Sequence, residues 1–240
     1  MPDKKSRLIT SQDAILTVLR DVLPEDCVMT GGTALTRFYG LGHRFSEDID
    51  LFSFDCCEDK VLSWLSALER AGAKTDVIAM ETSATGEDSS KVFHAIAVVT
   101  PHGGVPIRVD FVEDVFSGCW LPVQMKTVDS GVSFRVDSIE AILHKKLYAI
   151  YSNTMKSEPP RGKDAVDVFM LFKNFFDLND VRDFYRDGRD IVLPFESVIK
   201  ELAHREFDLS GIIDLDKNVE TEFLTWQEEL RSEPIASMQP

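Results

Sequence analysis

The sequence predicts an α+β protein, with a mixed sheet flanked by helices first and a helical lobe after it. In the first half of the chain, apolar and polar residues alternate with period two over segments such as 48–54, which is typical of strands. Amphipathic spacing such as 58–73 indicates helices between those strands. After about residue 138 only helical patterns occur. We therefore place an α/β core at 1–136 and a helical C-terminal lobe, sharing a cleft with it, at 137–240.

The core is expected to begin with a helix, because Ile15, Val18, Leu19 and Leu23 recur at helical spacing. Thr10 with Asp13 resembles a capping box, which predicts a helix start near Thr10. The remaining expected elements of the core are a short strand at 27–29, a short helix at 33–40, and strands at 48–54, 74–80, 91–100 and 106–112, with a helix at 58–73 and a loop at 81–90.

The second half is expected to open with a helix at 138–152, capped by Asp137 or Ser138. A second helix at 163–176 presents an apolar side. Further helical patterns lie near 179–186, 195–206 and 217–230.

Charge and composition limit the function classes. The 240 residues carry a net charge of −15, which argues against a broad, nonspecific nucleic-acid-binding surface. No apolar run approaches the roughly 20 residues that a membrane span needs, and the N-terminus lacks the apolar core of a secretion signal. We expect a cytoplasmic protein whose four cysteines are reduced and structural: Cys27, Cys56, Cys57 and Cys119.

Asp48 and Asp50 are one residue apart in a predicted strand, so both side chains project from one face. Two carboxylates so close repel each other unless a cation neutralises them. Oxygen ligands suit Mg²⁺ or Mn²⁺, and magnesium leaves coordination places for substrate phosphates.

Gly31 and Gly32 lie between a short strand and a helix, and Thr33 follows them. Glycine lets the backbone approach a ligand closely, and the first N–H groups of a helix attract anions. The order strand, Gly-Gly, helix, Asp-x-Asp strand therefore predicts a phosphate cradle beside a metal, as a nucleoside triphosphate requires.

Asp110, in another predicted strand, offers the third carboxylate of a two-metal site, and Arg108 shares its face. In this hypothesis Asp110 also takes the proton of an attacking hydroxyl. The reaction is in-line attack on the α-phosphorus with loss of pyrophosphate.

Each motif alone has an ordinary structural interpretation, and several positions keep two. Gly-Gly is often a simple turn, and Asp-x-Asp is often solvated surface. Ser46 either caps a turn or contacts substrate. His43 and Arg44 either steer a nucleotide or lie in a solvated loop, and Arg37 is ambiguous in the same way.

These residues resemble the DNA polymerase β-like nucleotidyltransferase superfamily, whose pattern is Gly-Gly or Gly-Ser, then Asp-x-Asp or Asp-x-Glu, then a later Asp. The longer string GGTALTRFYGLGHRFSEDIDLF is similar to the AbiEii family, the nucleotidyltransferase toxins of type IV toxin–antitoxin and phage-abortive systems. That family also has a helical lysine motif followed by Arg/Lys-Asp-x-x-Asp.

The lysine motif is matched by Lys146 with Asp164 and Asp167, the two aspartates being i and i+3 on one helical face. The resemblance implies that Lys146 stabilises the triphosphate in the active-site cleft and that the two aspartates belong to the nucleotide site. Arg161 and Lys163 border the same helix start and are expected to bind phosphate or RNA. An interhelical ion pair of Lys146 with Asp164 or Asp167 is the structural alternative.

The resemblance implies a magnesium-dependent transfer of a nucleoside monophosphate to an acceptor hydroxyl, with a tRNA 3′ end as acceptor. It also implies a toxin whose cognate antitoxin is a separate DNA-binding regulator. Two other functions stay open: transfer to a small molecule or a protein hydroxyl, and a non-catalytic module that senses nucleotides or binds a partner.

Overall fold

The computed structural model describes residues 3–85, 90–114, 124–128, 130–159, 161–186 and 193–232. The chain forms two compact units. The first unit consists of Met1–Gly40 and Ser46–Ala141, and the second of Leu41–Phe45 and Ile142–Pro240. Whereas the sequence analysis divided the chain near residue 136, the units divide after Ala141, and the short segment 41–45 goes with the second unit.

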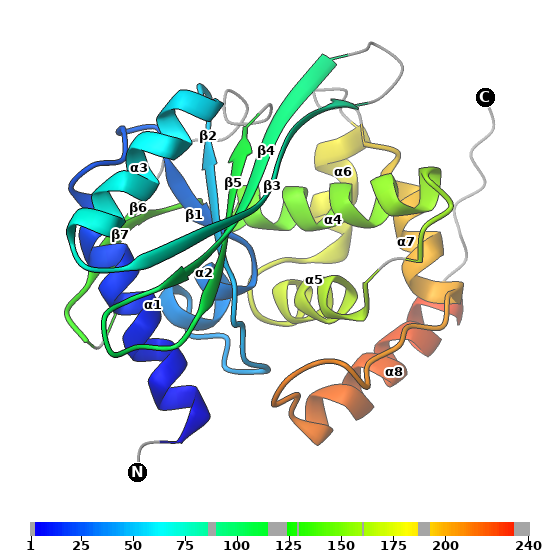
Figure 1. Ribbon diagram of the computed structural model, residues 1–240. Helices are drawn as coiled ribbons and strands as arrows, with labels where there is room; N and C mark the ends of the chain where they lie inside the picture. The colour runs from blue at the N-terminus through cyan, green and yellow to red at the C-terminus, as the bar shows by residue number, and fades with distance from the viewer. Residues whose placement is uncertain are drawn as a thin grey trace. The chain divides into compact units, whose positions relative to one another are not determined.

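The first unit is built on a seven-stranded mixed sheet of order β3-β4-β5-β2-β1-β7-β6 (Figure 1). The β2·β5 and β1·β7 pairs are parallel and the other four pairs are antiparallel. This sheet and the helices around it confirm the predicted α+β class. The strands are β1 (Val28–Thr30), β2 (Ile49–Ser53), β3 (Lys74–Thr85), β4 (Ser90–Thr100), β5 (Ile107–Glu113), β6 (Gln124–Thr127) and β7 (Ser133–Val136).

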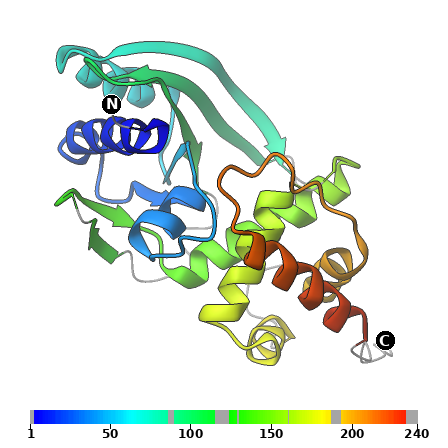
Figure 2. The same ribbon diagram turned by 90° about the horizontal axis from the view of Figure 1, so that it is seen from below.

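Helices α1 (Lys4–Arg20) and α3 (Glu58–Arg70) lie side by side against one face of this sheet (Figures 1 and 2). Trp64 of α3 contacts Phe111 of β5 with ring centroids 5.6 Å apart, which marks that face as the hydrophobic core. Burial alternates along β2, so Ile49 and Leu51 point into the core while Asp50 points to the opposite face. The short helix α2 (Gly31–Phe38) follows β1 directly.

Two expectations about the first unit were wrong. Helix α1 begins at Lys4, where the Asp3 side chain accepts a hydrogen bond from the Ser6 N–H; Thr10 lies inside the helix and donates to the Ser6 carbonyl. Strands β3 and β4 extend to Thr85 and from Ser90, into the segment expected as a loop. The sequence analysis also missed β6 and β7, because four-residue strands, one of them largely exposed, show too little alternation to detect.

The second unit is helical, and its core is aromatic. The rings of Phe169, Phe172, Phe223 and Trp226 contact one another at centroid distances of 5.4–6.2 Å. Ser138 caps the first of the helices through its hydroxyl, which accepts from the Ala141 N–H at 3.2 Å, as predicted. The helices are α4 (Ile139–Met155), which starts in the first unit, then α5 (Gly162–Asn174), α6 (Leu178–Arg186), α7 (Phe195–His204) and α8 (Lys217–Ser232).

Segment 41–45 is held within the second unit by backbone hydrogen bonds. The Phe45 N–H donates to the Ile213 carbonyl at 2.9 Å, and the Asp216 N–H donates to the His43 carbonyl at 3.1 Å. These bonds fix His43 and Arg44 beside the helices of that unit.

Among the described residues, no helix combines the length and the apolar character that crossing a membrane requires. Cys27 is buried, and Cys56 and Cys57 are free thiols. Burial raises the pKa of Cys56 to about 12, so this thiol stays protonated at neutral pH. Cys119 lies outside the described residues.

Candidate active site

Sheet register brings two of the three predicted carboxylates together. Asp50 of β2 pairs with Asp110 of the parallel neighbour β5, and with Thr30 of β1 on its other side. Paired residues of adjacent strands project from the same face, so Asp50 and Asp110 are neighbours opposite the face that α1 and α3 cover. Asp48 lies just before β2, two residues from Asp50.

Gly31 lies against Asp50 of this acidic pair. Its φ is +72°, and a Cβ at this position would lie 2.2 Å from Oδ2 of Asp50. Only glycine combines that backbone conformation with that space. The turn expected to hold phosphates and the strand expected to hold metal are therefore adjacent.

Thr33 connects the same two segments from inside the protein. It is fully buried in α2, and its hydroxyl donates to the backbone carbonyl of Asp48. The hydroxyl thus positions the loop that carries Asp48. Gly32 is buried beside it.

Asp110 is bound by two basic side chains. Arg108 donates from Nε to Oδ2 at 2.8 Å and from Nη2 to Oδ1 at 2.9 Å, and His94 of β4 lies with Nε2 3.1 Å from Oδ1. Although burial opposes ionisation of Asp110, hydrogen bonds from His94 and Arg108 lower its pKa below the ordinary value. Asp110 is therefore an ionised carboxylate, only 7% exposed.

The charges of the other two carboxylates, Asp48 and Asp50, also act on Arg108. Its pKa is raised first by the hydrogen bond to Asp110, against the effect of burial, and then by the charges of Asp110, Asp48 and Asp50. The sequence analysis placed Arg108 on the face of Asp110 but missed His94, because only the β4·β5 register reveals that neighbour.

The loop before Asp48 is anchored by a residue that sequence reasoning missed. Gln12 of α1 is fully buried and donates to the carbonyls of Ser46 and Glu47 at 3.1 and 3.2 Å. Arg37, for which the sequence left two interpretations open, donates to Gln12 at 3.3 Å and pairs with Asp13 at 2.5 Å, so its side chain contacts helix α1. Ser46 is buried, with its carbonyl engaged.

The predicted lysine motif forms a buried ion network within the second unit. Lys146 of α4 lies 2.6 Å from Oδ1 of Asp164 and 2.8 Å from Oδ2 of Asp167, both on α5. The interhelical ion pair kept as an alternative in the sequence analysis is therefore present. Arg161 adds a contact of 2.8 Å to Asp164.

His43 and Arg44 complete this network. Arg44 donates two hydrogen bonds of 2.7 Å to the two oxygens of Asp167, and His43 Nε2 lies 2.9 Å from Oδ1. The solvated-loop interpretation of these residues was wrong, since His43 is 3% and Arg44 6% exposed. The sequence offered no sign that a polar loop segment would pair with a helix more than a hundred residues later.

The ionised forms of Lys146, Asp164 and Asp167 are favoured over the neutral forms, although these side chains are buried. Burial opposes ionisation of Asp164 and Asp167, but Lys146 and the neighbouring arginines lower the pKa of both carboxyls. In turn the two aspartates raise the pKa of Lys146 against its burial. Lys163 is half-buried in the first turn of α5.

The donor types in the first unit fit a divalent metal ion. Asp48, Asp50 and Asp110 supply carboxylate oxygens, the ligands that Mg²⁺ and Mn²⁺ prefer. In the part of the chain that the structure describes, no three His, Cys, Asp or Glu side chains converge as a ready ligand set. Both oxygens of Asp110 are instead bonded to Arg108 and His94.

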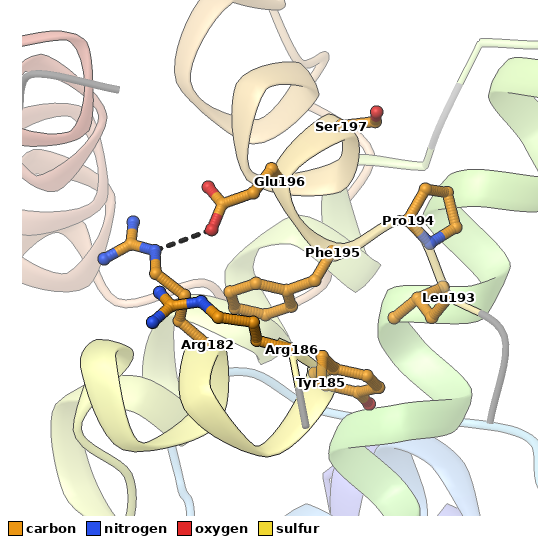
Figure 3. A pocket seen from close by; sticks show the side chains of 8 residues that line it. All are labelled: Arg182, Tyr185, Arg186, Leu193, Pro194, Phe195, Glu196 and Ser197. Atoms are coloured by element: carbon orange, nitrogen blue, oxygen red, sulfur yellow. Dashed lines mark hydrogen bonds and ion pairs between the residues drawn. The ribbon is translucent and has the colours of Figure 1, made fainter. Parts of the chain in front are cut away.

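The second unit also contains a pocket, whose lining residues are drawn in Figure 3. Tyr185 and Phe195 stack in it with centroids 5.1 Å apart, and Arg182 pairs with Glu196 at 2.7 Å. None of the predicted site residues lines it, so it is not the site that the motifs predict. Its lining consists of Arg182, Tyr185, Arg186, Leu193, Pro194, Phe195, Glu196 and Ser197.

Comparison with known proteins gives one family match. The family described as "Nucleotidyl transferase AbiEii toxin, Type IV TA system" matches residues 15–234. Among solved structures, the antibiotic-resistance factor ANT(2'')-Ia is similar at 17% identity, covering 76% of this chain and 93% of that one, with a TM-score of 0.47. Comparison with curated proteins finds no match.

Proposed function

Because this chain belongs to the AbiEii family of nucleotidyl transferase toxins, we propose that it transfers a nucleoside monophosphate from a nucleoside triphosphate to an acceptor hydroxyl. The observation that carries this proposal is the pairing of Asp50 with Asp110, directly against Gly31. Such a site needs acidic metal ligands next to a turn that admits phosphate oxygens.

Asp48, Asp50 and Asp110 are the residues that would hold Mg²⁺ or Mn²⁺. Such an ion, when bound, neutralises phosphate charge and activates the attacking and leaving oxygens. Asp110 accepts the proton of the acceptor hydroxyl. The hydroxyl of Thr33 donates its hydrogen bond to the Asp48 carbonyl and is therefore not available for phosphate. The phosphates are bound instead by the backbone N–H groups at the start of α2, from Gly31 onward.

The buried ion network of the second unit carries a net positive charge. Lys146, Arg44 and Arg161 face the two carboxylates of Asp164 and Asp167, which leaves an excess of one cation. That excess favours a polyphosphate or RNA backbone. Arg161, whose side chain is 57% exposed, and Lys163 make the direct contact, while the two aspartates orient Lys146.

RNA is the proposed acceptor, with the 3′ end of tRNA as its specific form. The type IV toxin–antitoxin description of the family supports a separate antitoxin, for which we propose a DNA-binding regulator. The net charge of −15 restricts RNA binding to local basic positions such as Arg161 and Lys163.

The test is nucleotide transfer by the purified protein with Mg²⁺, each of the four labelled nucleoside triphosphates, and total tRNA. Asp50→Asn is expected to lower transfer by about 10³-fold, because it removes a charged metal ligand. The matched control is Asp76→Asn, an exposed strand aspartate of the same unit, which is expected to keep full activity. Full transfer by a folded Asp50→Asn protein contradicts the proposal. Label on protein or on a small molecule, but not on RNA, contradicts the acceptor alone.

A further inference from the structure

We propose that Arg108 is the counter-ion of the acidic cluster when no metal is bound, and that a divalent cation and Arg108 compete for Asp110. The inference rests on the proposed function, since it concerns how the same carboxylates receive their metal. It assigns Arg108 a positioning role at that site.

The guanidinium of Arg108 binds both oxygens of the Asp110 carboxylate in a bidentate, fork-like arrangement. Nε and Nη2 of Arg108 each bond a different oxygen of Asp110, at 2.8 and 2.9 Å. Parallel bonds of this kind are the strongest way for a guanidinium to hold a carboxylate. They form because residues i and i+2 of β5 project from one face.

Charge explains why a cation is needed there. Asp50 pairs with Asp110, and Asp48 is two residues from Asp50, so three negative groups gather on a small area. The charges of all three act on Arg108. Without a cation at this place the carboxylates would repel one another.

Coexistence of Arg108 and a metal on Asp110 is unfavourable for two reasons. A metal ion needs the same carboxylate lone pairs that the fork occupies. A divalent charge placed there also repels the guanidinium. The Arg108 side chain is 48% exposed, so it can rotate into solvent without moving the strand. His94 keeps its contact to Oδ1 and holds Asp110 in place.

The experiment measures Mn²⁺ binding to the full chain, without nucleotide, by the electron paramagnetic resonance signal of free Mn²⁺. Arg108→Gln is expected to bind Mn²⁺ roughly tenfold more tightly than the unmodified protein, because the competing charge-assisted bonds are gone. Arg20→Gln, which removes an exposed arginine paired with Asp21, is the control and is expected to leave the affinity unchanged. The melting temperature without metal is expected to fall in Arg108→Gln and to recover with Mn²⁺.

Equal or weaker Mn²⁺ binding by Arg108→Gln overturns the competition, while the metal assignment stands if Asp50→Asn abolishes binding. Absence of binding in every chain overturns both. If Arg108→Gln does not fold, Arg108→Lys serves instead: it keeps the positive charge but loses the paired bonds to the two oxygens of Asp110, so a smaller gain in affinity supports the inference and no gain overturns it.

Discussion

At the scale of one residue, Gly31 combines a constrained backbone conformation with a close contact to Asp50. Its positive φ disfavours any side chain, and the carboxylate of Asp50 fills the place of a Cβ. Gly40 also has a positive φ, of +71°, but a Cβ there meets nothing within 4 Å. The two glycines therefore separate the effect of strain from the effect of contact with Asp50.

Gly31→Ala and Gly40→Ala are each expected to lower the free energy of unfolding by about 1–2 kcal/mol, the usual cost of a left-handed alanine. Only Gly31→Ala is expected to reduce nucleotide transfer, by about 10²-fold, because it displaces the Asp50 carboxylate by an ångström or more. Urea denaturation and the transfer assay measure the two effects. Equal activity of the two variants would contradict the proposed contact.

At the scale of elements, the network between α4, α5 and segment 41–45 joins parts of the second unit through buried charges. Asp167 is fully buried and is contacted by Lys146, Arg44 and His43. Removing one partner of such a network leaves an uncompensated charge, which is more destabilising than the pair is stabilising.

The network makes stability fall in acid. The pKa values of Asp164 and Asp167 are lowered from 3.8 in the folded state, so the unfolded chain binds these protons first as the pH drops. The stabilisation is fully present above about pH 5. It is lost progressively as the pH falls below 3.8 through the lower pKa of the folded state.

Asp167→Asn is expected to lose about 3–5 kcal/mol of stability at pH 7, because Lys146 and Arg44 keep their charges. Its stability should also decline less on acidification than that of the unmodified protein. Urea unfolding between pH 3 and pH 7 measures both. Asp183→Asn, at an exposed position of the same unit, is the control, and an acid dependence identical in all three proteins would argue against the network.

At the scale of the whole molecule, the net charge of −15 produces self-repulsion at neutral pH. Screening by salt should therefore stabilise the folded chain, since most of the repelling carboxylates are at the surface.

Raising NaCl from about 20 to 300 mM at pH 7.5 is expected to increase the melting temperature by a few degrees, through a shorter Debye length. Near the isoelectric point of about 4.7 the same change is expected to have little effect, because the net charge vanishes. Thermal unfolding followed by circular dichroism checks both. A melting temperature that falls with salt at pH 7.5 would show that attractive pairs outweigh the net repulsion.

Most elements could be predicted from sequence because their apolar residues repeat at helix or strand spacing. The helices near 179–186, 195–206 and 217–230 correspond to α6, α7 and α8. Strands β6 and β7 were missed because they are short, and the start of α1 was misplaced because an Asp3 cap lies ahead of the apolar repeat.

The sequence alone determined the α+β class and the order of glycine pair, Asp-x-Asp and later aspartate, because periodicity and spacing are local properties. It also determined that Lys146, Asp164 and Asp167 lie on neighbouring helices. Only the tertiary structure decided that Asp50 pairs with Asp110, that Arg108 and His94 hold Asp110, and that Arg44 is buried on Asp167. Strand register and ion pairs between distant segments depend on how the chain folds back on itself, which no local pattern encodes.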